Sequence, residues 1–108
     1  LLKRGDLNIA VSTGGSSPAL AGKIKNRLSK CYGPEYETWL ALLRRIRPLV
    51  LTLGLNQDKN KKIFHSLTEE EVLQMVQTGD RQDLLYSLKQ RLPQAVHAQL
   101  GDVLHDLL

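Results

Sequence analysis

The chain has 108 residues, of which 42% are hydrophobic and 24% are charged, and its formal net charge is +4. This composition is ordinary for one folded unit of a soluble protein. No apolar run approaches the roughly 20 residues of a membrane span, so a cytoplasmic location is the default expectation. The positive charge favours an acidic partner without choosing its kind.

The first predicted element is a strand over residues 7–13. Leu7, Ile9 and Val11 alternate with small or polar residues, which is the period of two expected of a strand with one buried face. No other segment shows this pattern so well, and a lone strand cannot satisfy its backbone hydrogen-bonding groups. We therefore expect this strand to pair with a second copy of the chain or with a segment outside it.

A glycine-rich turn follows the strand. Gly14 and Gly15 permit dihedrals that other residues avoid. Ser17 is a good helix N-cap, and Pro18 suits the first helical position. Free N–H groups and the positive end of the helix dipole would meet here as an anion site. The alternative is a capped turn that binds nothing. The segment that would form this anion site consists of Ser12, Thr13, Gly14, Gly15, Ser16, Ser17 and Pro18.

Helices account for the rest of the chain. The first covers residues 19–30 and bears Lys23, Arg27 and Lys30 outside its apolar stripe. A second helix opens at Pro34 and runs, with a kink at Pro48, to residue 53. Shorter helices are predicted over residues 58–65 and 68–78, then from Asp80 to Pro93, and again after Pro93. The fold class is therefore mainly α, with one N-terminal strand and a Gly-Gly turn before a bundle of short helices.

Two features mark the starts of the later helices. Thr68 and Glu71 have the spacing of a capping box, in which each side chain bonds the backbone of the other. Gly79 is expected to end one helix, and Asp80 to cap the next.

The sequence predicts no metal site. Cys31 is the only cysteine, which excludes an intrachain disulfide and a cysteine-rich metal centre, and we expect it to be a half-buried apolar residue. His97 and His105 are separated by about two turns of helix, too far for the common one-turn ligand pair. Trp39 is expected to be buried between helices rather than to stack on a ligand.

The segment RGDLNIAVSTGGSSPALA, residues 4–21, resembles the precorrin-2 dehydrogenase and siroheme synthase family. The family pattern there is R-G-D-L-x-I-A-(V/I)-S-(T/S)-G-G-x-S-P-x-L-A. Tyr32-Gly33-Pro34-Glu35-Tyr36 also resembles the start of the family's next helix. The later helices match the family in type and order rather than by motif.

The resemblance implies an enzyme that oxidises precorrin-2 to sirohydrochlorin with NAD, on the route to siroheme. Some members of the family also insert ferrous iron. The resemblance implies a homodimer, with Leu7, Ile9 and Val11 pairing across its interface. It also implies that residues 12–17 line the tetrapyrrole cleft. Residues 1–53 would form the dimerisation region and residues 54–108 a small helical domain.

The chain departs from the family in what it lacks. The family's NAD-binding glycine loop and acid–base aspartate lie upstream of the matching segment, and neither occurs in these 108 residues. We therefore expect a fragment that is inactive alone, with NAD bound by a missing N-terminal domain and no cofactor or catalytic residue in the fragment itself. The absence of an initiator Met agrees with this expectation.

The ligand that the resemblance implies suits the positive charge. Precorrin-2 carries several carboxylates, which Lys23, Arg27 and Lys30 could meet as charge-assisted pairs, although a solvated helix face is the alternative for each residue. Two other functions stay open. One is a basic helical nucleic-acid-binding module that uses the lysines near residues 59–62. The basic residues of the chain are dispersed, which disfavours this function. The other is an oligomerisation module without a ligand.

Overall fold

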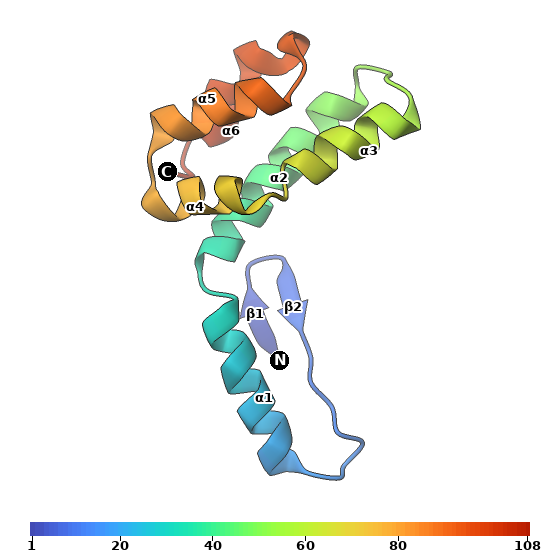
Figure 1. Cartoon of the computed structure of the whole chain (residues 1–108), viewed down its shortest axis with the longest axis vertical. Helices are drawn as coiled ribbons and strands as arrows, with labels where there is room; N and C mark the ends of the chain where they lie inside the picture. The colour runs from blue at the N-terminus through green and yellow to red at the C-terminus, as the bar shows by residue number, and fades with distance from the viewer.

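The computed structural model, which describes residues 1–108, begins with a β-hairpin (Figure 1). Strand β1, Leu2–Arg4, pairs antiparallel with β2, Leu7–Ile9, in a register that places Leu2 opposite Ile9. Gly5 is the first residue of the two-residue turn, and its φ angle is 58°. A type II′ turn requires a positive φ at this position, which glycine adopts readily.

The hairpin corrects the prediction of a lone strand. The partner of β2 is β1, within the same chain. β1 is only three residues long and too short to show an alternating pattern. β2 also ends at Ile9, four residues before the predicted end, although Leu7, Ile9 and Val11 are all half-buried and the residues between them are exposed. The hairpin has two strands, so the other edge of β2 is unpaired.

The hairpin lies beside helix α1, Pro18–Cys31, and the two form an arm, residues 1–31 (Figure 1). Arg4 joins them, because its guanidinium donates to the backbone oxygens of Tyr32 and Ser29 at 2.9 and 3.3 Å. Such contacts satisfy carbonyls that the end of a helix leaves free. No residue of α1 is buried, and Leu2 is the one buried residue of the arm.

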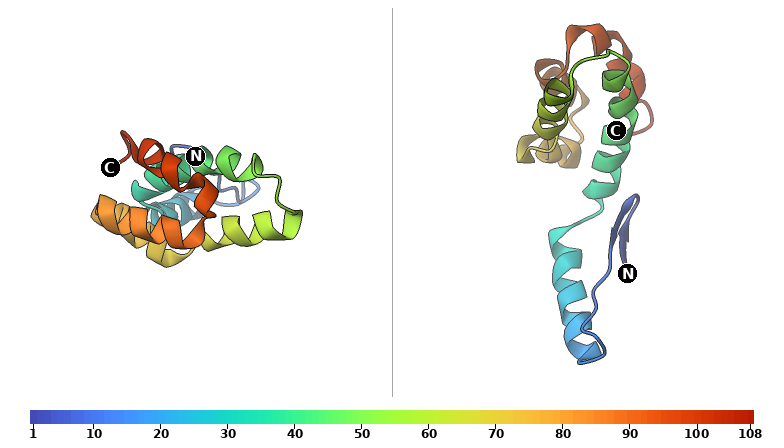
Figure 2. Two further views of the ribbon diagram at one scale, coloured as in Figure 1. Left: turned by 90° about the horizontal axis from the view of Figure 1, so that it is seen from above. Right: turned by 90° about the vertical axis from the view of Figure 1, so that its right-hand side faces the viewer.

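The remaining residues, 32–108, form a helical bundle above the arm (Figures 1 and 2). Its elements in chain order are α2 Glu35–Leu51, α3 Gln57–Ser66, α4 Glu70–Thr78, α5 Arg81–Arg91, the 3₁₀ helix η1 Gln94–Gln99, and α6 Leu100–Leu104. Pro48 lies inside α2, which continues through it to Leu51. The prediction that one helix runs through Pro48 is therefore confirmed. None of these helices combines the length and the apolar character needed to cross a bilayer.

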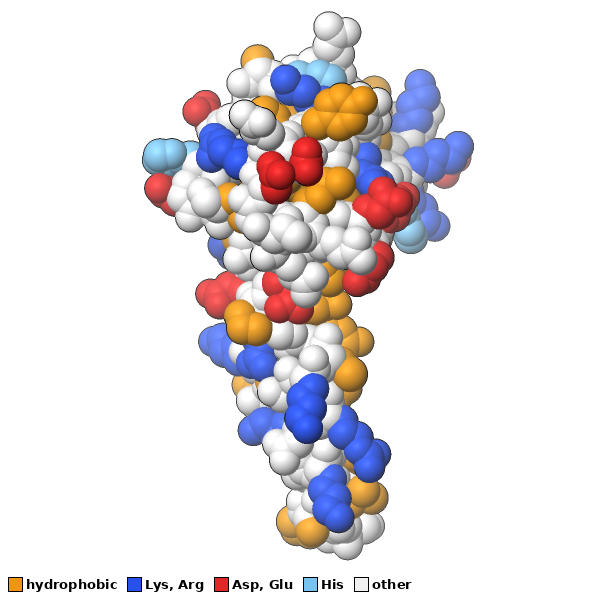
Figure 3. Space-filling view, turned by 60° about the vertical axis from the view of Figure 1, so that its left-hand side comes forward, with side chains coloured by type: hydrophobic (Ala, Val, Ile, Leu, Met, Phe, Trp, Pro, Cys, Tyr) orange, Lys and Arg blue, Asp and Glu red, His pale blue; other side chains and the backbone are white.

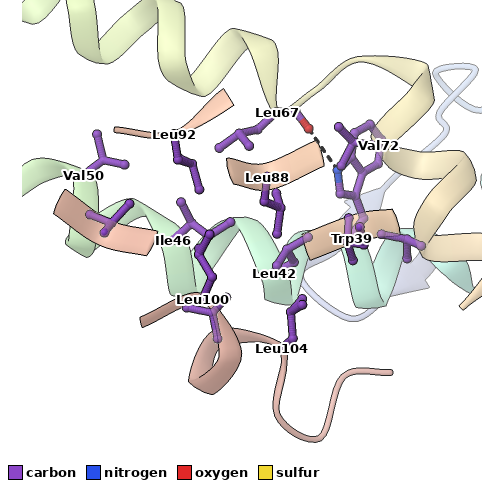
Figure 4. Packing of buried hydrophobic residues seen from close by; sticks show 14 of the residues in the cluster. Trp39, Leu42, Ile46, Val50, Leu67, Val72, Leu88, Leu92, Leu100 and Leu104 are labelled. Carbon is purple, nitrogen blue, oxygen red and sulfur yellow. Dashed lines mark hydrogen bonds between the residues drawn. The ribbon is translucent and has the colours of Figure 1, made fainter. Parts of the chain in front are cut away.

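A single apolar core holds the bundle together (Figure 4). Leu42, Ile46 and Val50 of α2 face it, together with Leu88 of α5 and side chains of α4 and α6. Trp39 is buried as expected, and its indole Nε1 donates to the carbonyl of Leu67 at 3.1 Å. Helix α2 packs against α4 and α6 in this core.

The helix ends confirm some predictions and correct others. Ser17 and Asp80 accept hydrogen bonds from the amides of Leu20 and Asp83, and Gly79 ends α4 in a left-handed conformation. The prediction of a capping box formed by Thr68 and Glu71 is wrong. α4 has no side-chain cap, since the Thr68 hydroxyl donates to the carbonyl of His65.

The molecule is elongated. Its principal extents are 52, 31 and 20 Å, and its radius of gyration is 16.7 Å. A compact domain of this length would have a radius of gyration of about 13 Å. The difference arises because the arm extends away from the bundle rather than packing along it (Figure 2).

Candidate functional site

The predicted site residues 12–17 form one turn at the end of the arm farthest from the bundle (Figure 1), and all but Thr13 and Ser17, which are half-buried, are exposed. Thr13 holds this turn closed, because its hydroxyl donates to the Ser17 carbonyl and accepts from the Ser17 amide, both at 3.1 Å. The Ser16 amide donates to the Thr13 carbonyl at 3.0 Å. Thr13 therefore shapes the turn, a structural role that the sequence pattern did not distinguish from ligand binding.

The turn uses several of its own amides internally. The Gly14 amide donates to the Ser12 hydroxyl at 3.2 Å, and the Leu20 amide donates to the Ser17 hydroxyl at 3.0 Å. The amides of Gly15 and Ala19 donate no hydrogen bond within the chain. An anion at the helix start would thus meet two free backbone donors rather than the full set expected from the sequence.

Gly14 and Gly15 keep the turn open. Their φ angles are 63° and 81°, in the region that favours glycine, and a Cβ placed on either residue would contact nothing within 4 Å. Glycine is therefore required here by the backbone conformation and not by crowding within the chain. Open space above both residues leaves room for a ligand to approach the backbone.

The predicted basic residues lie along α1 at different distances from this turn. Lys23, Arg27 and Lys30 are all exposed, and their spacing places them on one face of the helix. At 1.5 Å per residue, Lys30 lies about 20 Å along the axis from Ser17, whereas Lys23 lies about 9 Å from it. Lys23 is thus the basic residue of this face nearest the turn, and Lys30 lies at the opposite end of the arm.

The arm carries the net positive charge of the protein. Residues 1–31 include six basic residues and one acidic residue, a net charge of +5, whereas residues 32–108 include nine basic and ten acidic residues, a net charge of −1. Figure 3 shows basic side chains spaced along the arm and side chains of both signs over the bundle. The long-range attraction for an anion is therefore concentrated on the arm.

The structure corrects the expectation about Cys31 and shows how the aromatic residues at the junction pack. Cys31 is exposed and not half-buried, because nothing covers its side of α1. Tyr36 packs on Tyr32 and Trp39, with ring centroids 5.1 and 5.6 Å apart, at the junction between arm and bundle. Burial raises the pKa of Tyr36 above its ordinary value, and the nearby carboxylate of Glu70 raises this pKa further.

Arg4 was not recognised from the sequence as a residue that positions the site. Besides its bonds to the carbonyls of Tyr32 and Ser29, its guanidinium donates to the Ser29 hydroxyl at 3.0 Å. Arg4 therefore fixes the hairpin on the end of α1 opposite the glycine turn. The only sequence signal for it is its place at the start of the matching segment.

Comparison with known proteins adds two findings. Residues 4–30, which make up most of the arm, match the family described as sirohaem biosynthesis protein central. A 68-residue stretch, 63% of the chain, is 29% identical to a precorrin-2 dehydrogenase of Priestia megaterium and covers 34% of that enzyme. The chain is thus similar to the precorrin-2 dehydrogenase and siroheme synthase family. The resemblance inferred from residues 4–21 is thereby confirmed.

These matches cover only part of the chain and only part of the matching enzyme. The chain spans about a third of the length of the precorrin-2 dehydrogenase that it matches. No solved structure matches the chain significantly. The similarity to the family is therefore most specific over the arm, the part of the chain that contains the glycine turn and the basic face of α1.

Proposed function

We propose that the chain is the dimerisation and tetrapyrrole-binding part of a precorrin-2 dehydrogenase, an enzyme that oxidises precorrin-2 to sirohydrochlorin with NAD. One observation carries this proposal: the residues that match the sirohaem family, 4–30, coincide with an arm that holds the positive charge and has no buried residue in its helix. Some members of the family that the chain resembles also insert ferrous iron, and the proposal itself concerns only the oxidation.

The ligand chemistry follows from the arm. A tetrapyrrole precursor is a wide macrocycle with carboxylates around its rim. One carboxylate at the glycine turn would accept from the free amides of Gly15 and Ala19, and the positive end of the α1 dipole would favour it. Other carboxylates would meet Lys23 and Arg27 along the helix as charge-assisted hydrogen bonds.

The residues of this chain do not fit NAD. Dinucleotide-binding folds place a glycine-rich loop between a parallel strand and a helix, whereas the sheet here is an antiparallel hairpin of two three-residue strands. The proposal therefore gives these residues the binding and positioning of the tetrapyrrole, and places the NAD site of the parent enzyme outside them.

Tetrapyrrole binding is tested by a matched pair of charge-neutralising variants. We expect Lys23→Gln/Arg27→Gln to raise the Kd for sirohydrochlorin about tenfold or more, because two charge-assisted contacts are lost. Lys59→Gln/Lys62→Gln removes the same charge from α3 and should change the Kd less than about twofold, since exposed distant charges act weakly. Absorbance titration measures both.

The glycine turn supplies an independent variant for the same titration. Gly14→Val places a β-branched side chain at a φ of 63°, so the turn must change conformation, and binding should be lost with the helical circular dichroism retained. Equal Kd values for the two charge variants, or unchanged binding by Gly14→Val, would refute a tetrapyrrole site on the arm. The chain would then be an oligomerisation module without a ligand.

The proposal places a dimer interface on the arm. β2 has one unpaired edge, and Leu7, Ile9 and Val11 are only half-buried in the single chain. In α1, Leu20 is 48% exposed and no residue is buried. Unpaired strand edges and exposed apolar residues of this kind are commonly covered by a second chain.

The dimer is tested at Leu20, whose substitution leaves the core of the single chain intact. We expect Leu20→Asp to weaken dimerisation about tenfold or more, while an acidic residue in the first turn of α1 suits the helix dipole. Leu51→Asp is the control, because Leu51 is 46% exposed but lies in α2. Sedimentation equilibrium measures both. A wild-type monomer, or equal effects of the two variants, would refute the interface.

A further inference from the structure

A cavity of about 400 Å³ lies where the hairpin meets the bundle, apart from the glycine turn. Its walls come from the hairpin tip, from α2, and from α3 and the residues that follow it. Leu40 and Leu43 of α2 form its apolar surface together with Phe64 and Leu67. A volume of this size is within the range of small-molecule sites, which are mostly apolar with a few placed polar groups.

Three charged residues line the same cavity: Asp6, Arg44 and Arg47. Arg44 and Arg47 are three residues apart on α2 and so lie on one face of that helix. Arg44 is paired with Asp6, at 2.8 Å between its Nη1 and the Oδ2 of the carboxylate. The three groups together leave a net charge of +1, so the cavity is complementary to one negative charge.

Arg47 is the group available to hold that charge. Its guanidinium lies over the Phe64 ring, with Cζ 4.7 Å from the ring centroid, and it donates no side-chain hydrogen bond within the chain. An arginine positioned by a ring retains its fork of N–H donors for a planar acceptor such as a carboxylate. Arg47 also borders a second hollow between α2 and α3, which contains Lys61 and no acidic side chain.

We propose that this cavity binds a small apolar monocarboxylate, with its body against Leu43 and Phe64 and its carboxylate on Arg47. This site is separate from the proposed tetrapyrrole turn in place and in ligand size, and it does not depend on that proposal. The apolar walls supply the affinity for the ligand body, and the single unbalanced positive charge supplies the preference for an anion.

The test uses 2-naphthoate as the probe and the neutral 2-naphthalenemethanol as its isostere, with Kd values measured by calorimetry on the full chain. Wild type should bind the naphthoate more tightly than the alcohol. Arg47→Met keeps an unbranched apolar stem but removes the guanidinium, and it should raise the Kd for naphthoate about tenfold, with little change for the alcohol. Asp6→Asn removes the competing carboxylate and should lower the Kd for naphthoate about threefold.

Lys23→Met is the control for nonspecific attraction to the basic arm, and it should leave the naphthoate Kd unchanged. Circular dichroism verifies that each variant is folded. The proposal is overturned if naphthoate does not bind at millimolar concentration, if the two probes bind equally, if Arg47→Met has no effect, or if Lys23→Met has the larger effect. Arg47→Met should leave the Kd for sirohydrochlorin unchanged, because the proposed tetrapyrrole site and the cavity are separate sites.

Discussion

Replacing Ile46 with alanine should lower the free energy of unfolding by about 3 kcal/mol, within the 2–5 kcal/mol that such truncations cost in well-packed cores. Ile46 is fully buried at the middle of α2, where it faces residues of α5 and α6 (Figure 4). The bundle is small, so the surrounding helices have little freedom to close the cavity that alanine would leave.

Urea unfolding measures this effect through the fluorescence of Trp39, the only tryptophan of the chain, which is itself in the core. Leu51→Ala is the matched control, because Leu51 lies in the same helix but is 46% exposed, and it should cost less than about 1 kcal/mol. Similar losses for both variants would show that α2 is not anchored by the face assigned to the core.

Replacing Arg91 with alanine should cost about 3 kcal/mol, a large effect for a charged residue. Its side chain is only 14% exposed, and its guanidinium donates to the Ser66 carbonyl at 2.7 Å and to the Ser87 hydroxyl at 3.1 Å. Alanine would leave both acceptors without their donor, and unsatisfied buried groups cost about 1–3 kcal/mol each. The salt bridges to Glu69 and Glu71 add little, because both carboxylates are exposed.

Two further variants separate geometry from charge at this site. Arg91→Lys keeps the charge but lacks the fork of donors, so it should lose nearly as much stability as Arg91→Ala. Glu71→Gln should cost less than about 0.5 kcal/mol, since its carboxylate is 74% exposed. Full stability of the lysine variant would mean that charge alone, and not the bonds to Ser66 and Ser87, holds α5 against the start of α4.

The elements predicted well are those fixed by local chemistry. The first helix was expected over residues 19–30 and covers 18–31, because Ser17 and Pro18 determine its start within the chain itself. Asp80 and Gly79 marked helix ends for the same reason.

The errors arose where distant residues decide the outcome. Glu71 accepts a hydrogen bond from Arg91, 20 residues away, rather than capping its own helix. β1 was missed because a three-residue strand has no readable period, and it forms through its pairing with β2. At the candidate site, the sequence located the turn, but only the structure shows that Thr13 closes it and that Lys30 lies far from it.

The elongated arm has a mechanical consequence. It meets the bundle through the short Tyr32–Pro34 connection and through the exposed pair between Asp6 and Arg44. α1 has 14 residues and is therefore about 21 Å long. A rotation of about 10° at that connection would displace the glycine turn by about 4 Å, more than the length of a hydrogen bond. The angle between the arm and the bundle therefore sets where the turn presents its free amides, and a small torque at the junction is amplified at the tip.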